Sequence, residues 1–192
     1  MLTTAQPKRD PLGSYVNSVP LKRILVIGTG GSGKTTVARQ LAERTGLPLV
    51  HLDVLYWRAG WQPTPAEEWR VMVRQLVTAD EWIIDGNYGG TLDLRLEACD
   101  TVVFLDIPRS ACLWRVLKRQ VRYLGRVRPD LAPGCRERLS WEFLVWIWTH
   151  PTRRRGDILR RLAALGTEKR VVILRSSAGI GQFLACVPDA AA

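Results

Sequence analysis

The sequence predicts an α/β fold in which strands alternate with helices. Five short apolar runs predict the strands, and they lie at residues 24–27, 48–52, 82–85, 101–106 and 170–174. These runs are largely continuous rather than alternating, which is typical of strands that are buried on both faces of a sheet. Between them, apolar residues recur at the three- and four-residue spacing of amphipathic helices.

The composition of the chain is ordinary for a soluble globular protein. Of its 192 residues, 46% are hydrophobic and 24% are charged, and we expect one domain at residues 21–192 after a flexible tail at residues 1–20. No apolar run approaches the roughly 18 residues that a membrane span needs, and the first residues lack the apolar core of a secretory signal. The four cysteines form no C-x-x-C pair, which favours free thiols in a reducing cytoplasm.

A glycine-rich stretch follows the first predicted strand directly. Gly28-Thr29-Gly30-Gly31-Ser32-Gly33-Lys34-Thr35 fits the pattern G-x-x-x-x-G-K-[ST] of the phosphate-binding P-loop. In such a loop, glycines allow backbone N–H groups to surround the phosphates at the N-terminus of the next helix. We expect Lys34 to bind the β- and γ-phosphates of ATP and Thr35 to bind Mg²⁺ through its hydroxyl group. The expected nucleotide-binding residues are Gly28, Gly30, Gly31, Ser32, Gly33, Lys34, Thr35 and Thr36.

An aspartate and several aromatic residues follow the second predicted strand. Asp53 lies at the carboxyl end of that strand, where ligands bind in open α/β sheets. We expect Asp53 to order Mg²⁺ through water or to accept a proton from a substrate hydroxyl group; the alternative is a residue that only caps a loop. Tyr56, Trp57 and Trp61 follow in an expected loop. They are predicted either to contact the substrate or to form a small structural cluster under that loop.

The third predicted strand ends in a candidate metal ligand. Asp85 follows three apolar residues, which is the Walker-B arrangement, and its carboxylate would hold Mg²⁺ or the water shell of that ion. Asp106, at the end of the fourth strand, is the alternative for this role, but the glycine after Asp85 favours Asp85. Asn87 and Arg95 are candidate contacts of the acceptor, and for Arg95 the alternative is a surface salt bridge.

Positive charge is concentrated in the second half of the chain. The net charge is +10; residues 109–175 hold 17 Lys and Arg against five Asp and Glu, whereas residues 1–108 hold 11 against 12. Two basic helices joined by a loop, at about residues 115–140, predict an arginine-rich lid that stabilises the transferred phosphoryl group and excludes water. Pro151 is expected to end the second helix. The alternative is an ordinary solvated basic face.

Taken together and in this order, these stretches resemble the adenylate-kinase-like group of P-loop kinases, and more closely the bacterial DNA topology modulation proteins related to FlaR. The resemblance covers about residues 22–187 and depends on residues 28–35, 51–53, 82–88, 103–108 and 130–136. It implies a P-loop NTPase fold with a five-stranded parallel sheet, the P-loop strand in the middle and helices on both faces, and it implies ATP and Mg²⁺. Arg115 and Arg119 match the arginines that open the lid, and Arg136 and Arg138 match lid arginines on the returning helix.

One departure from this family concerns the acceptor. Nucleoside monophosphate kinases commonly carry Asp-Gly-Phe-Pro-Arg after the third strand, with the arginine on the acceptor phosphate. Here the stretch is Asp85-Gly86-Asn87-Tyr88, and the next arginine is Arg95. We therefore expect an ATP-dependent phosphotransferase for a small molecule that need not be a nucleoside monophosphate, with Lys34, Asp53 and the four lid arginines as its catalytic residues.

Two other functions fit the sequence. The basic segment at residues 109–175 would suit a nucleic-acid-associated ATPase or regulator whose binding weakens steeply with salt, although no helix-turn-helix or zinc-finger pattern supports it. The tryptophan-rich segment at residues 141–148 would suit an ATP-gated protein partner, or it packs in the core. A kinase instead predicts a saturable small acceptor.

Overall fold

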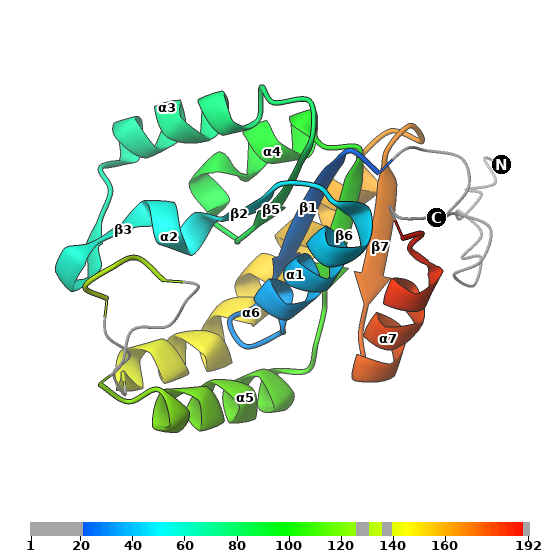
Figure 1. Ribbon diagram of the computed structural model, residues 1–192. Coiled ribbons are helices and arrows are strands. Elements are labelled where there is room, and N and C mark those ends of the chain that lie inside the picture. Colours follow the sequence, from blue (N-terminus) through cyan, green and yellow to red (C-terminus); the bar gives the residue numbers. More distant parts are fainter. Residues whose placement is uncertain (1–20, 126–130, 136–139, 190–192) are drawn as a thin grey trace, which may run out of the picture.

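A parallel sheet forms the centre of the fold. The computed structural model describes residues 21–125, 131–135 and 140–189, without the side chains of residues 150–153. In this part of the chain, five strands form the sheet in the order β2-β5-β1-β6-β7, so the predicted sheet and the central position of the P-loop strand are confirmed (Figure 1). The strand bounds are Leu49–His51 (β2), Trp82–Asp85 (β5), Arg23–Gly28 (β1), Thr101–Leu105 (β6) and Arg170–Leu174 (β7).

Helices cover both faces of this sheet, as predicted (Figure 1). Ile24 and Val26 of β1 pack with α1 and α7 on one face, while Leu25 and Ile27 pack with α3, α4 and the second half of α6 on the other. No helix of the described residues combines the length and the apolar character that crossing a membrane requires. The helix bounds are Lys34–Thr45 (α1), Leu52–Tyr56 (α2), Ala66–Leu76 (α3), Leu92–Ala98 (α4), Arg109–Arg122 (α5), Trp141–Ala163 (α6) and Ser177–Cys186 (α7).

The segment after β2 differs from the expected strand end and loop. β2 ends at His51, and Asp53 lies in the first turn of the short helix α2. Beyond α2, a small antiparallel hairpin forms in place of the loop, and Thr64 ties it to α2 by donating both its N–H and its hydroxyl group to the Tyr56 carbonyl. The hairpin consists of Trp57–Arg58 (β3), the 3₁₀ turn Ala59–Trp61 (η1) and Gln62–Pro63 (β4).

Helix α6 is longer than the sequence predicts. It begins after Ser140, whose side-chain oxygen accepts a hydrogen bond from the N–H of Phe143. The helix is 23 residues long and continues through Pro151. The prediction that Pro151 ends this helix is wrong. A proline removes one backbone hydrogen bond, but Ile158 and Leu162 beyond it pack into the core, and their burial offsets the loss.

The predicted lid lies only partly within the described residues. Its first helix is α5, and residues 131–135 belong to its loop. Arg136 and Arg138, the two lid arginines expected on the returning helix, lie outside the described residues. The structure therefore bears on the lid arginines of α5 alone.

The described part of the lid loop packs against the hairpin (Figure 1). Leu131, Ala132 and Cys135 are buried against Trp57 and Trp61. The Cys135 thiol also donates a hydrogen bond to the carbonyl of residue 58 at 3.3 Å. This lid–hairpin contact joins segments that are about 70 residues apart in the sequence.

Candidate active site

The glycine-rich loop joins β1 to α1 at the carboxyl edge of the sheet. The Ser32 N–H donates to the Thr29 carbonyl at 3.0 Å, and the same oxygen accepts a hydrogen bond from Nζ of Lys34 at 3.2 Å. Gly33 occupies the N-cap position of α1 with φ of 101°, and no side chain of the described residues caps this helix end. The first-turn N–H groups of a helix are an anion-binding site, so this loop has the geometry that phosphate binding requires.

Helix α5 packs directly on this loop. Gly31 has φ of 80°, and a Cβ atom added to it would lie 2.3 Å from the carbonyl oxygen of Cys112 and 2.8 Å from the Val116 side chain. Real Cβ atoms do not approach other atoms so closely. Glycine at this position is thus required by the approach of α5 as well as by the backbone conformation.

The lid helix also brings an arginine to the P-loop. Arg115 donates hydrogen bonds to the Ser32 carbonyl at 3.0 Å and to the Ser177 hydroxyl group at 2.9 Å. It therefore links the P-loop to the start of α7. Arg119 lies one turn further along α5.

The carboxylate of Asp85 contacts the P-loop helix. Its Oδ2 atom accepts a hydrogen bond from the Thr35 hydroxyl group at 2.9 Å and lies 3.1 Å from Nδ1 of His51. Its Oδ1 atom is buried and accepts no hydrogen bond from any described residue. A hydroxyl group beside a carboxylate oxygen with free lone pairs is the hard oxygen donor set that suits Mg²⁺. Since the described residues contain no group of three or more His, Cys, Asp or Glu side chains able to hold a metal, an ion here would take its other ligands from phosphates and water.

Asp106, the alternative Walker-B residue, has other partners. Its carboxylate pairs with Arg155 of α6 at 2.6 Å and with Arg175, just after β7, at 3.2 Å. Burial alone would raise the pKa of Asp106, but the hydrogen bonds from Arg155 and Arg175 outweigh burial and hold this pKa below its ordinary value. Asp106 thus joins α6 to the sheet, and of the two aspartates only Asp85 contacts Thr35.

We expect Asp106→Asn to lower the free energy of unfolding by about 1–3 kcal/mol at pH 7. Because the folded-state pKa lies below the unfolded value, this stability is present above the ordinary pKa of an aspartate and is lost as the pH falls through the folded-state pKa. Urea denaturation at pH 7 and pH 3 should therefore show a difference from the wild type that shrinks at pH 3. Asp157→Asn, which removes exposed ion pairs within α6, is the control and should cost less than about 1 kcal/mol. A difference that is independent of pH would contradict the expectation.

Asp53 forms a short hydrogen bond with a tyrosine of the loop after β5. The Tyr88 hydroxyl group donates to Oδ1 of Asp53 at 2.5 Å. Burial, and next the negative charge of Asp53, raise the pKa of Tyr88 well above its usual range, so the phenol stays protonated and keeps donating. Tyr88 has φ of 31°, a strained conformation for a bulky residue, and such strain concentrates at functional sites.

Tyr88→Phe should cost about 1–3 kcal/mol of unfolding free energy, because a hydrogen bond to a carboxylate is lost. The folded-state pKa of Tyr88 is raised, so its contribution is present below the ordinary value of 10.0 and is lost as the pH rises beyond it. Denaturation at pH 7 and pH 11 should show this loss in the wild type and not in Tyr88→Phe. Tyr56→Phe is the matched control within the same aromatic cluster. Its free energies of unfolding at pH 7 and at pH 11 should be nearly those of the wild type.

The aromatic residues after Asp53 pack with one another. The Tyr56 ring lies 4.5 Å from that of Tyr88 and 5.1 Å from that of Trp69, measured between ring centroids. Trp57 packs against Tyr56 and against Trp61. These contacts favour the interpretation of Tyr56 and Trp57 as a structural cluster beside Asp53 over that of direct substrate contacts.

Arg95 is not placed to contact an acceptor. Its side chain is fully buried and donates hydrogen bonds to the carbonyls of Gly86, Asn87, Tyr88 and Thr91. Burial lowers the pKa of Arg95 to about 10, so the guanidinium group is still charged at neutral pH. The prediction that Arg95 contacts the phosphoryl acceptor is therefore wrong, because its buried guanidinium group donates its hydrogen bonds to four backbone carbonyls.

Asn87 has a structural partner in the P-loop. Its Oδ1 atom accepts a hydrogen bond from the Gly28 N–H at 2.9 Å, and its Nδ2 atom donates to the Gly28 carbonyl at 2.6 Å. The amide group thus ties the loop after β5 to the first residue of the P-loop. Each end of the amide makes one hydrogen bond, and Asn87 also lines the cavity described below, so its contact with substrate stays a prediction.

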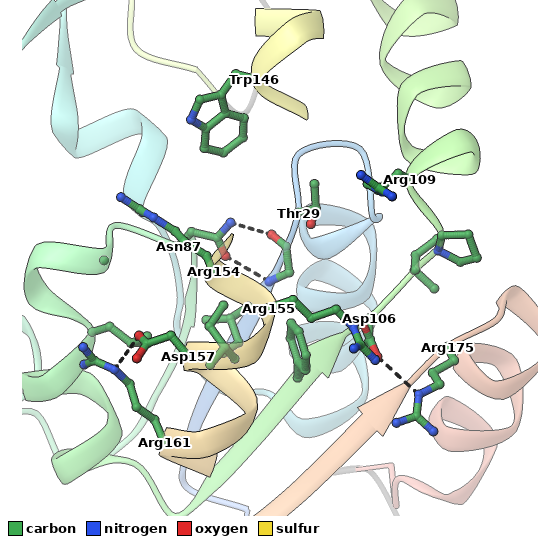
Figure 2. Close-up of a pocket in the computed structure, with 18 residues that line it drawn as sticks. Thr29, Asn87, Asp106, Arg109, Trp146, Arg154, Arg155, Asp157, Arg161 and Arg175 are labelled. Atoms are coloured by element: carbon green, nitrogen blue, oxygen red, sulfur yellow. Dashed lines mark hydrogen bonds and ion pairs between the residues drawn. The ribbon is translucent and has the colours of Figure 1, made fainter. Parts of the chain in front are cut away.

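A cavity of about 560 Å³ lies beside the P-loop, a volume that suits a small ligand (Figure 2). It is bounded by Gly28 and Thr29, by the loops after β5 and β6, and by α6. Arg154 of α6 lies here with Nη1 next to Gly89, where an added Cβ would be 3.0 Å away, and it forms no hydrogen bond or ion pair with any described residue. The sequence shows Arg154 only as one of three consecutive arginines, so its role depends on the unexpected continuation of α6.

Comparison with known proteins supports the fold. No protein-family model and no curated protein matches the chain. Among solved structures, shikimate kinase from Acinetobacter baumannii, in complex with shikimate, matches with a TM-score of 0.52 and 20% identity over 86% of this chain and 89% of that chain. A gluconokinase from Sinorhizobium meliloti 1021 matches with a TM-score of 0.49 and 18% identity over 88% and 93% of the two chains. Deoxyadenosine kinase from M. mycoides, with bound dATP, has a TM-score of 0.46 and 12% identity over 85% and 97%.

These structural neighbours are small-molecule P-loop kinases, and at such identities the likeness shows the fold alone. The chain has the α/β P-loop fold that it shares with the shikimate kinase. The closer resemblance to FlaR-related proteins is not confirmed and stays a prediction. Binding of nucleic acid likewise stays a prediction.

Proposed function

We propose that this chain is a kinase that transfers the γ-phosphoryl group of ATP to a small acceptor. The observation that carries the proposal is the contact between Asp85 and Thr35 beside a complete P-loop, together with a buried Asp85 oxygen that accepts no hydrogen bond from the described part of the chain. In phosphoryl transfer the protein contributes mainly positioning and charge stabilisation, and this arrangement provides both.

The nucleotide half of the proposed site lies along the P-loop and α1. Residues 28–36 bind the phosphates through backbone N–H groups, and Lys34 leaves the Thr29 carbonyl to pair with the β- and γ-phosphates. Arg115 and Arg119 of α5 stabilise charge on the transferred group, together with Arg136 and Arg138. Thr35 and Asp85 would hold Mg²⁺, which supplies charge neutralisation of the phosphates when bound.

The acceptor half lies in the cavity beside Gly28 and Thr29. Asp53 does not line this cavity itself, but its hydrogen-bond partner Tyr88 lies in the sequence between the cavity-lining residues Asn87 and Gly89. In the proposed reaction the acceptor hydroxyl oxygen bonds to the γ-phosphorus, the bond from that phosphorus to the β–γ bridging oxygen breaks, and ADP leaves with the electron pair. The hydroxyl proton passes to the Asp53 carboxylate.

We also propose that residues 21–192 act as one cytoplasmic domain after a tail at residues 1–20, with the lid at about residues 115–140. The packing of α5 on the P-loop supports this, because it keeps the lid helix in the same unit as the nucleotide site.

The test is ADP formation from Mg·ATP at fixed salt, with and without each member of an acceptor panel. The panel contains nucleoside monophosphates, deoxynucleosides, polyols, hydroxylated carboxylates and duplex DNA, and Lys34→Ala is the inactive control. Saturable stimulation by a small molecule, absent in Lys34→Ala, is the expected result. Stimulation by duplex DNA alone would overturn the proposal in favour of a nucleic-acid-associated ATPase that uses the basic segment at residues 109–175.

A further inference from the structure

The walls of the cavity are largely apolar. Its lining includes Ile27 of β1, Phe104 of β6, Leu92 of α4 and Ile158 of α6. The side chain of Trp146 lies at one end (Figure 2). A ligand that fills this space therefore places much of its body against carbon rather than against hydrogen-bonding groups.

Most polar side chains of the cavity already have partners. Asn87 uses both ends of its amide on Gly28, and the Asp106 carboxylate accepts hydrogen bonds from Arg155 and Arg175. The Asp157 carboxylate likewise pairs with arginines of its own helix. A polyol that binds here would lose hydrogen bonds between its several hydroxyl groups and water, and the cavity offers few acceptors to replace them. Each hydroxyl group left unpaired lowers the affinity for the polyol.

One cation of the cavity has no such partner. Arg154 makes no hydrogen bond or ion pair with the described residues, whereas Arg155 and Arg161 on the same helix each pair with an aspartate (Figure 2). The Arg154 guanidinium group reaches the backbone at Gly89, which directly follows Tyr88, the hydrogen-bond partner of Asp53. A guanidinium group of this kind binds carboxylate or phosphate oxygens through two parallel hydrogen bonds.

We infer that the acceptor is a hydroxylated organic anion with a mainly apolar body. Its anionic group pairs with Arg154, its body lies against the apolar walls, and its hydroxyl group points to the P-loop. This inference rests on the proposed function, because the cavity serves as the acceptor site only if phosphoryl transfer occurs beside it. It excludes sugars and other polyols as the preferred acceptors.

Binding of probes that cannot be phosphorylated tests the anion site separately from the reaction. Ligand-observed NMR at constant ionic strength, with Mg²⁺ and a non-hydrolysable ATP analogue, would compare cyclohexanecarboxylate, phenyl phosphate, cyclohexane-methanol and sorbitol. We expect one or both anions to bind, the neutral compounds to bind more weakly, and Arg154→Met to weaken anion binding about tenfold or more. Arg160→Met, on an exposed arginine of the same helix that does not line the cavity, should change it less than twofold.

The carboxylate and phosphate arms decide which anionic group the acceptor carries. Equal binding of sorbitol and the anions, no binding of any probe, or equal losses in Arg154→Met and Arg160→Met would each overturn the inference. ADP formation with hydroxycyclohexanecarboxylates and with sorbitol then separates the two proposals. Anion binding without any stimulated turnover would contradict the proposed kinase function but not the anion site. Turnover that is stimulated only by polyols and is unchanged in Arg154→Met would contradict the inferred acceptor class but not the kinase function.

Discussion

Asp85→Asn should weaken binding of Mg·ATP by about 10- to 100-fold while leaving binding of metal-free ATP nearly unchanged. The substitution keeps the shape of the side chain, and the Thr35 hydroxyl group can still donate a hydrogen bond to it. What it removes is the negative charge of the carboxylate, whose buried Oδ1 atom accepts no hydrogen bond within the described ranges. Isothermal titration of ATP in excess Mg²⁺ and in EDTA measures the two affinities directly and needs no knowledge of the acceptor.

Asp106→Asn is the control for Asp85→Asn, since Asp106 pairs with Arg155 and Arg175 rather than with the P-loop helix. Its two affinities should stay within about twofold of the wild type. Equal losses of affinity with and without Mg²⁺ in Asp85→Asn would show that Asp85 supports the loop and does not act on the metal. A loss of Mg²⁺ dependence in Asp106→Asn alone would reassign the Walker-B role.

Arg95→Met should lower the free energy of unfolding by about 3–5 kcal/mol. Methionine fills a similar volume, but it donates to none of the four carbonyls that Arg95 satisfies, and three of these belong to the consecutive residues Gly86, Asn87 and Tyr88. A buried carbonyl group without a hydrogen bond has lost its contact with water and gained no other partner, which lowers the free energy of unfolding. Guanidinium chloride denaturation followed by circular dichroism measures this change.

Two further variants separate the hydrogen bonds of Arg95 from its charge. Arg95→Lys keeps the charge but cannot supply the planar fork of donors, so most of the loss should remain. Arg70→Met removes a partly exposed arginine that pairs with Asp93 and the Gly90 carbonyl, and it should cost far less stability than Arg95→Met. Full stability in Arg95→Lys would mean that charge alone stabilises the loop.

The sheet and the P-loop could be predicted because their signals are local. Each strand is a continuous apolar run, and the P-loop is a contiguous motif with a strand before it and a helix after it. Asp85 could be ranked above Asp106 because Gly86 follows it, and the contact with Thr35 agrees with that order.

The roles of the other polar residues depend on contacts that local patterns do not contain. Arg95 and Asn87 have partners that are mostly backbone atoms, and every residue offers the same carbonyl and N–H groups, so the sequence gives no sign of which are paired. Arg154 reaches the cavity only because α6 continues through Pro151, where tertiary packing overrides the local preference of proline. The lid–hairpin contact depends on the approach of distant segments, which no pattern in either segment encodes.

The close approach of α5 to Gly31 changes how the nucleotide motif should respond to mutation. The pattern G-x-x-x-x-G-K-[ST] leaves residue 31 open, so a library with all amino acids at each motif position is expected to retain variety there in most proteins. In this chain, any side chain at residue 31 meets the carbonyl oxygen of Cys112 before a nucleotide is involved. Selection should therefore return glycine at residue 31 even when it acts only on folding, and a smaller residue in place of Val116 should not restore tolerance, because the nearest obstacle is main chain.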